Sequence, residues 1–261
     1  MPNQSGWAGA PAAHRAAIAA ETGRFVEVIR GADPATPVPG CPGWTLVDLV
    51  RHAGSVQRWF SVLLRQLVQE APRSRDVELD LPKHEDGYAD WLTASAAEAG
   101  SVFAATDPDA PMWAWGADQH ARFWVRRMLF ETLVHRTDAE VALGLTPEID
   151  CGLAADGVDE FLVNLPFAAF FAPKVAALRG NGETLRFRCT DADGDWLVRL
   201  RPDGFGLDES PAAPGSADAA VHGAAADLLL LMYGRLGHDA DAFETHGDED
   251  LLTRWFDNSA F

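Results

Sequence analysis

The sequence predicts a four-helix bundle followed by a smaller α+β domain. Two patterns support this prediction. In four segments of the first half, apolar residues recur at helical spacing. In the second half the period drops to two around residues 184–200, which indicates strands. The chain has 261 residues, of which 48% are hydrophobic, and this is enough to bury the cores of two domains. We therefore expect one domain at residues 1–150 and a second at 151–261.

Four helices are expected in the first domain, each with an apolar face. The first covers Pro11–Arg30 and ends before Gly31, a residue that commonly terminates helices. The second opens at Thr45, where Asp48 completes a capping-box pattern three residues later. Four helices in succession favour an antiparallel bundle. The remaining two are expected at Asp86–Ala105 and from about Asp118 to Leu143.

The second domain is expected to combine a hairpin with helices. Thr184–Cys189 and Trp196–Leu200 alternate between polar and apolar residues on either side of a turn at Asp193-Gly194-Asp195, as antiparallel strands do. Pro211–Asp218, rich in Ala, Pro, Gly and Ser, is expected to be a loop. Further strands are expected after Gly204 and around Ala219–His222, and helices at Gly152–Phe171, Ala224–Leu236 and Asp248–Phe256.

Composition excludes several classes of partner. The formal net charge of −18 argues against nucleic acid, because phosphate binding needs a basic face. No apolar run reaches the roughly 20 residues of a membrane helix, and the N-terminus lacks the pattern of a signal peptide. The three cysteines form neither a zinc ribbon nor a disulfide framework, which suits a reducing compartment. We expect a cytoplasmic protein without a membrane partner, and a monomer, since no exposed heptad seam indicates an oligomer.

Three side chains form a candidate metal site. Glu131 and His135 are four residues apart on the fourth helix, so they share one face. His52 lies on the seam of the second helix with Leu49 and Val56, and it is expected to point toward the bundle interior. Two imidazoles and one carboxylate leave a coordination position open, as in catalytic zinc sites. The pattern alone also allows a structural histidine and a surface Glu–His pair.

Three segments resemble the mycothiol-dependent maleylpyruvate isomerase family, whose N-terminal bundle is of the DinB-like type. They are TPVPGCPGWTLVDLVRHAGSVQRWF (Thr36–Phe60), PMWAWGADQHARFWVRRMLFETLVHRTDAEVALG (Pro111–Gly144) and AAADLLLLMYGRL (Ala224–Leu236). The resemblance implies that the metal ligands fall on His52, Glu131 and His135. Thr137 departs from the family pattern, because many members carry tryptophan or another bulky residue there. This departure puts the lining of the pocket in doubt, but not the metal site.

The resemblance also implies mycothiol as a thiol cosubstrate. Zn²⁺ is the ion expected from the ligand types, although other first-row divalent metals suit them too. A divalent ion lowers the pKa of a bound thiol and so provides a thiolate at neutral pH. In an isomerase the thiolate would add to the double bond of an anionic enone acid, and rotation and elimination would return the trans isomer.

Two other functions remain open from the sequence. In a mycothiol S-transferase the same thiolate would attack an electrophilic small molecule and stay attached to it. A non-catalytic protein that binds a metal or a small molecule is the third possibility. The intact ligand trio disfavours this third function, because an unused site has no reason to keep all three ligands.

Arg235 and His120 are the candidate catalytic residues beside the metal. Arg235 ends an apolar helix, from which it would neutralise an anionic substrate; an arginine in a last turn also favours the helix dipole. His120, near the start of the fourth helix, is a candidate proton donor or simply a partly exposed histidine. Arg127, four residues before Glu131, is expected to form an ion pair with it.

Asp138 and Trp124 are the candidate cofactor-binding residues. Asp138 would either orient His135 as a hydrogen-bond acceptor or pair with an arginine at the surface. Trp124, together with Trp113 and Trp115, would line a mycothiol pocket or fill the core. We do not expect Cys41 to act as a nucleophile, because the external thiol does that work.

Overall fold

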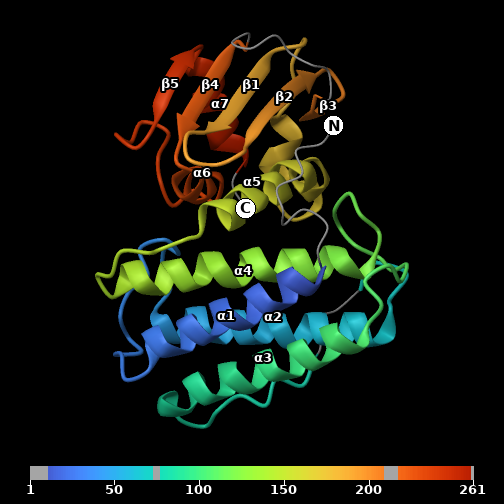
Figure 1. The fold of residues 1–261 in the computed structure, drawn as a ribbon, viewed down its shortest axis with the longest axis vertical. Coiled ribbons are helices and arrows are strands. Elements are labelled where there is room, and N and C mark those ends of the chain that lie inside the picture. The colour runs from blue at the N-terminus through green and yellow to red at the C-terminus, as the bar shows by residue number, and fades with distance from the viewer. Residues whose placement is uncertain (1–10, 73–76, 209–216, 260–261) are drawn as a thin grey trace. The chain divides into compact units, whose positions relative to one another are not determined.

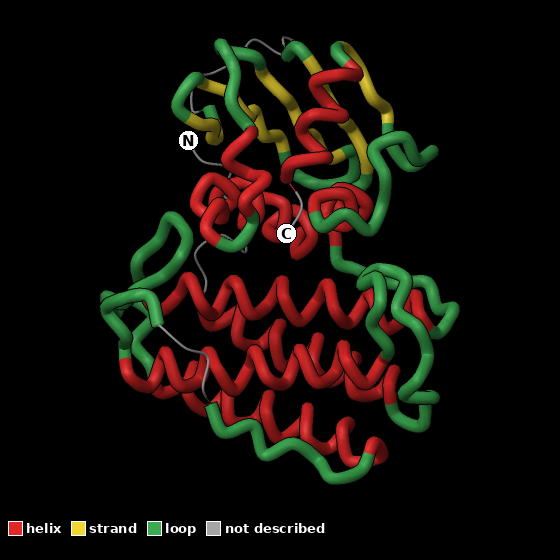
Figure 2. Tube along the Cα trace, turned by 180° about the vertical axis from the view of Figure 1, so that it is seen from behind, coloured by secondary structure: helices red, strands yellow, loops and turns green. Residues whose placement is uncertain are grey.

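The structure is a computed structural model that describes residues 11–72, 77–208 and 217–259. The chain divides into two compact units, each of which is described by itself (Figure 1). The first, here called the helical unit, comprises the described residues up to Ala114 together with Asp118–Glu148. The second, here called the sheet unit, comprises Trp115–Ala117 and the described residues from Ile149 onward. All the described strands belong to the sheet unit (Figure 2).

The helical unit is a four-helix bundle, which confirms the fold predicted for the first half. Helix α1 packs against α3 and α4, and α2 also packs against α3 and α4 (Figure 1). Each helix buries an apolar face, as the periodicity indicates. The helices are α1 (Pro11–Ile29), α2 (Leu46–Gln66), α3 (Tyr88–Ala105) and α4 (Ala121–Ala142).

Local chemistry accounts for where α2 and α4 begin. Thr45 and Asp48 form the predicted capping box, in which the Thr45 backbone N–H donates to Asp48 Oδ2 at 3.1 Å. Helix α4 begins three residues later than expected. His120 forms an isolated β-bridge with Pro111, and this bridge keeps its backbone extended rather than helical.

A buried ion pair connects α4 to α1. The Arg136 guanidinium, 1% exposed, donates from Nε to Glu21 Oε2 at 2.8 Å and from Nη1 to Glu140 Oε2 at 2.5 Å. Its Nη2 donates to the Glu148 carbonyl at 3.2 Å. Because a buried charge is costly unless it is paired and hydrogen-bonded, these three acceptors favour one packing of α1 against α4.

The sheet unit contains a five-stranded mixed sheet in the order β3-β2-β1-β4-β5. The predicted hairpin is confirmed: β1 and β2 are antiparallel, with Phe187 opposite Trp196. Strand β4 runs parallel to β1, whereas β3 and β5 are antiparallel to their neighbours. The strands are β1 (Thr184–Cys189), β2 (Asp195–Arg201), β3 (Gly204–Leu207), β4 (Ala219–Gly223) and β5 (Glu244–Gly247).

Helices cover one face of this sheet. Trp255 of α7 packs against Phe187 and Phe205, with ring centroids 5.7 and 5.5 Å apart. Helix α6 packs against β1, β4 and α5. The helices are α5 (Cys151–Asn164), α6 (Ala225–Met232) and α7 (Glu249–Ser259), with short 3₁₀ segments at Leu165–Phe170 and Pro173–Ala177.

Several predicted boundaries in the second half are wrong. Helix α5 ends at Asn164, because Pro166 has no N–H to donate and the chain continues as a 3₁₀ turn. Helix α6 ends at Met232, shortly before Gly234, which adopts a left-handed conformation (φ 70°). Strand β5 was not predicted. Most of the loop predicted at Pro211–Asp218 lies outside the described residues.

Within the described ranges, none of the helices combines the length and the hydropathy that a membrane crossing requires.

Candidate metal centre

His52, Glu131 and His135 meet between α2 and α4. Nε2 of His52 lies 2.9 Å from Oε1 of Glu131, and Nε2 of His135 lies 3.3 Å from the same oxygen. The two imidazole rings stand nearly perpendicular, with their centroids 4.9 Å apart. The structure therefore brings together the three residues that the sequence singled out as a metal site.

The trio lies at the rim of the bundle and not in its interior. The side chains of His52, Glu131 and His135 are 32%, 24% and 11% exposed, respectively. The expectation that His52 points into the core was wrong. Its side chain lies at the edge of the contact between α2 and α4, where solvent reaches it. This placement leaves an approach from solvent to the three ligand atoms.

The three side chains fit a divalent ion. One ligand atom from each lies within 4.8 Å of the other two. Ligands that surround an ion tetrahedrally at about 2.0–2.2 Å are themselves about 3.3–3.6 Å apart. The 2.9 and 3.3 Å separations are close to this spacing, so small side-chain rotations would admit the ion. Two imidazoles and a carboxylate also form the donor set of a three-ligand catalytic zinc site.

The pKa values of Glu131 and His135 are shifted in opposite directions. Burial by itself would raise the pKa of Glu131, but hydrogen bonds from His135 and His52 and the charge of Arg127 hold that pKa well below its usual value. Burial would likewise lower the pKa of His135, but hydrogen bonds to Asp138, Cys41 and Glu131 hold it well above its usual value. The predicted pair of Arg127 and Glu131 is present, with Nη2 3.5 Å from Oε2.

Asp138 fixes the orientation of His135. Its Oδ2 lies 3.0 Å from His135 Nδ1, and its side chain is 1% exposed. Of the two roles considered for Asp138, this geometry favours the acceptor that orients the imidazole, as carboxylates behind metal-bound histidines do. Cys41 Sγ also donates to Asp138 Oδ2, at 3.5 Å. Cys41, His135 and Asp138 could themselves hold an ion, but only through Nδ1, the nitrogen that faces away from Glu131.

A hollow of about 600 Å³ opens beside His52. The Trp44 ring lies 5.1 Å from the His52 ring and 6.3 Å from the His135 ring, so it lines the approach to the trio. Arg51 contributes a half-exposed guanidinium that pairs with Asp48 at 3.0 Å. Neither Trp44 nor Arg51 was predicted from the sequence, although Arg51 is the direct neighbour of His52. The other lining residues are Gly43, Ser55, Leu79 and Leu81.

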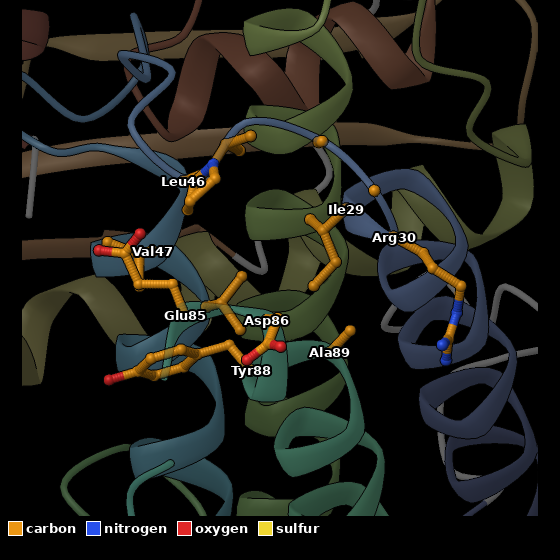
Figure 3. A pocket seen from close by; sticks show the side chains of 12 residues that line it. Ile29, Arg30, Leu46, Val47, Glu85, Asp86, Tyr88 and Ala89 are labelled. Carbon is orange, nitrogen blue, oxygen red and sulfur yellow. The ribbon is translucent and has the colours of Figure 1, made fainter. Parts of the chain in front are cut away.

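Another cavity, of about 350 Å³, lies on a different side of α2 (Figure 3). Ile29, Leu46 and Tyr88 are among its lining residues, and Arg30, Glu85 and Asp86 add charged groups. It contains none of the three metal-site residues. The hollow beside His52 is therefore the candidate substrate site.

Thr137, the residue that departs from the family pattern, does not line the hollow. Its side chain is buried, and its hydroxyl donates to the Val134 carbonyl at 2.7 Å. Thr137 is therefore not part of this lining, and its effect on the pocket stays a prediction.

Trp124 is fully buried in an aromatic cluster with Trp59, Phe60, Trp113 and Phe123. Its indole N–H donates to the Trp113 carbonyl at 2.8 Å. It precedes Glu131 by two helical turns, about 10 Å along the axis. These contacts are those of a core residue, and binding of mycothiol by Trp124 stays a prediction. Trp115 lies in the sheet unit, where it packs against Phe171.

Of the two candidate catalytic residues, His120 shares the helical unit with the ligand atoms and Arg235 does not. His120 precedes Glu131 by three turns of α4, roughly 16 Å along the axis, and its Nδ1 lies 2.6 Å from Asp118 Oδ1. Arg235 belongs to the sheet unit, where its Nη1 donates to the Tyr233 carbonyl at 2.7 Å. Catalytic roles for both residues stay predictions.

Comparison with known proteins identifies the family. Residues 15–140 match the family model of the mycothiol maleylpyruvate isomerase N-terminal domain, and residues 152–254 match that of the MDMPI C-terminal domain. The chain is also similar in structure to a mycothiol-dependent maleylpyruvate isomerase and to a histidine-to-alanine mutant of such an isomerase. Each match has 15% identity, covers 90% of this chain and 92% of the other, and has a TM-score of 0.59. At this identity the likeness shows the fold. No curated protein matches the sequence. The two family models together place the chain in the mycothiol-dependent maleylpyruvate isomerase family.

Proposed function

We propose that this protein is a metal-dependent enzyme that uses mycothiol to convert a cis enone acid of the maleylpyruvate type into its trans isomer. Metal dependence is supported by one observation: His52, Glu131 and His135 lie together beside an open hollow. Membership of the family supports the choice of mycothiol and of the substrate class.

The three side chains would hold one divalent ion, which we propose to be Zn²⁺. When bound, the ion supplies a positive charge that lowers the pKa of a thiol and keeps it as a thiolate at neutral pH. Asp138 accepts a hydrogen bond from Nδ1 of His135 and so keeps Nε2 directed toward Glu131, where it would serve as a ligand. The trio is partly exposed, so a thiol would be able to reach a bound ion from solvent.

Arg51 and Trp44 would position the substrate. An anionic enone acid needs a cation at its carboxylate, and the Arg51 guanidinium offers a charged fork on the wall of the hollow. The Trp44 ring offers an apolar surface next to His52 for the carbon chain. Arg235 remains a second proposed partner of the carboxylate.

The reaction balances without any oxidant or reductant. The thiolate sulfur forms a bond to the carbon β to the carbonyl, and the π electrons of the double bond move to the carbonyl oxygen. The former double bond is then single and rotates. Return of the electrons expels the thiolate, which regenerates the thiol and leaves the trans double bond.

Product analysis tests this proposal and separates it from the transferase. Metal-loaded protein is incubated with maleylpyruvate and sub-stoichiometric mycothiol, and the products are followed by proton NMR. The proposal predicts many turnovers to the trans isomer with mycothiol unchanged. Consumption of mycothiol with accumulation of an adduct would instead indicate an S-transferase. Failure to form either product, with metal bound, would indicate a protein that only binds metal or a small molecule.

A further inference from the structure

Two histidines and a glutamate also meet on the sheet unit. His222 lies on β4, and Glu244 and His246 lie on β5, the strand at the edge of the sheet beside β4 (Figure 1). In the register of the two strands, Glu244 is directly opposite His222 and His246 is opposite Ala220. His222 and His246 are therefore diagonal neighbours, which face the same side of the sheet.

The separation of these side chains suits a single metal ion. The rings of His222 and His246 have centroids 5.4 Å apart. A nitrogen of each ring and a carboxylate oxygen of Glu244 all lie within 4.8 Å of one another. Glu244 and His246 are exposed and His222 is half-buried, so that an ion could reach all three from solvent.

The group lies on the face of the sheet that α7 does not cover. Val221 of β4 points to the opposite face from its neighbours Ala220 and His222, and it is fully buried. Phe187, which is opposite Val221 on β1, is buried on the same face and packs against the Trp255 ring of α7. Apart from Thr184 at the start of β1, the residues of β1, β2 and β4 that point to the other face are half-buried or exposed. No packing requirement of the core explains why two histidines and a glutamate should share this face.

The charges around the group are mixed. The Glu244 carboxylate is the negative charge of the group. Arg188 is opposite His222 across β1 and β4. Arg186 is also on this face, but it is held by Asp195 through Nε at 2.7 Å. Burial, His246 and Arg188 lower the pKa of His222, and Glu244 opposes this shift. Arg188 is exposed, so its charge is screened by solvent.

We propose that His222, Glu244 and His246 bind one divalent transition-metal ion, Zn²⁺ by ligand type, at a site separate from the helical trio. The donor set is again two imidazoles and one carboxylate. Its ligands come from two strands, so the ion ties β5 to β4. An edge strand of four exposed residues has little apolar packing to hold it in place. The proposal does not depend on the function proposed above.

Metal stoichiometry tests the site. Full-length wild-type protein and its His246→Ala and His222→Ala variants are dialysed against a series of Zn²⁺ concentrations, and bound zinc is measured by elemental analysis. Loss of a partner outside the coordination sphere already weakens metal binding about 10- to 100-fold, so loss of a ligand should do at least as much. Each variant should bind one equivalent less than the wild type. His84→Ala, which removes an exposed histidine outside the candidate groups, should bind as much as the wild type.

The site is tested by the difference in bound zinc between the wild type and its two variants. Equal zinc binding by the wild type, His246→Ala and His222→Ala would overturn the site, whatever the helical trio binds. Melting curves recorded in a chelator confirm that the variants remain folded. Amide hydrogen exchange then tests the role of the ion. Zn²⁺ should slow exchange in β4 and β5 of the wild type and not of His246→Ala, and exchange unchanged by Zn²⁺ in the wild type would overturn the tie between the strands.

Discussion

His135 and Asp138 face each other one turn apart on α4, with Nδ1 of the imidazole 3.0 Å from the buried carboxylate. This contact directs the other ring nitrogen, Nε2, toward Glu131. A single helix thus carries a candidate metal-binding carboxylate, an imidazole and the acid that orients that imidazole. The chemistry of the site depends on this arrangement.

Replacement of Asp138 should weaken metal binding without unfolding the bundle. Asp138→Ala should bind Zn²⁺ at the helical trio about 10- to 100-fold more weakly, because the His135 ring loses its hydrogen-bond acceptor. The affinity is measured by competition with a chromophoric chelator, in a His246→Ala background so that only the trio is titrated. Asp138→Asn, which retains an acceptor, should recover part of the affinity, and the exposed Asp90→Ala serves as a control. Wild-type affinity in Asp138→Ala would disprove the orienting role.

Metal binding should release a proton at neutral pH. The raised pKa of His135 means that its imidazole is protonated in the metal-free protein, whereas the lowered pKa of Glu131 keeps that carboxylate ionised. Zn²⁺ must displace the imidazole proton, so its apparent affinity should rise with pH until the pH passes the raised pKa of His135. Calorimetry at pH 7 in two buffers of different ionisation enthalpy reports the proton count. Identical heats in both buffers would contradict this protonation state.

Arg51 should contribute to substrate binding and not to metal binding. Arg51→Ala should raise KM for the anionic substrate about tenfold, the loss of one charge-assisted hydrogen bond, with a smaller change in kcat and full metal content. Arg65→Ala is the matched control, since Arg65 lies on the same helix, is equally exposed and pairs with Glu98. Equal steady-state constants for the two variants would remove Arg51 from the site.

Two glycines should respond in opposite ways to alanine. A Cβ on Gly54 would lie 2.3 Å from the Trp91 ring, where α2 and α3 touch, so Gly54→Ala should lower the free energy of unfolding by about 1–3 kcal/mol. Gly100 lies on α3 with nothing near its would-be Cβ, so Gly100→Ala should raise stability by about 0.5–1 kcal/mol. Urea unfolding of the metal-free proteins measures both. A stabilising Gly54→Ala would show that α2 and α3 are not packed this closely.

Much of the fold could be predicted because its signals are local. The four bundle helices and the β1–β2 hairpin have clear periods of 3.6 and 2, and the Thr45–Asp48 capping box lies within four residues of sequence. Strand β5 had no such signal. Its residues, Glu244–Gly247, are all exposed and show no alternation, and only pairing with β4 makes them a strand.

The candidate site could be predicted in part for the same reason. The spacing of Glu131 and His135 is local, and so is the position of His52 on the apolar seam of its own helix; the family resemblance then singled out these three residues. The hollow was not predictable, because Trp44 and Leu79 reach it from loops whose positions depend on long-range packing. Helical periodicity also could not place His52 at the rim, since its orientation depends on how α2 crosses α4.

The most direct test of the central claim is the initial rate of maleylpyruvate isomerisation with mycothiol in wild-type protein that is first stripped of metal by a chelator and then reloaded with Zn²⁺. The rate should be lost on stripping, return on reloading, and stay absent in His52→Ala under both conditions. Undiminished isomerisation by the stripped protein, together with unchanged activity of His52→Ala, would contradict the assignment of His52, Glu131 and His135 as the metal centre of this enzyme.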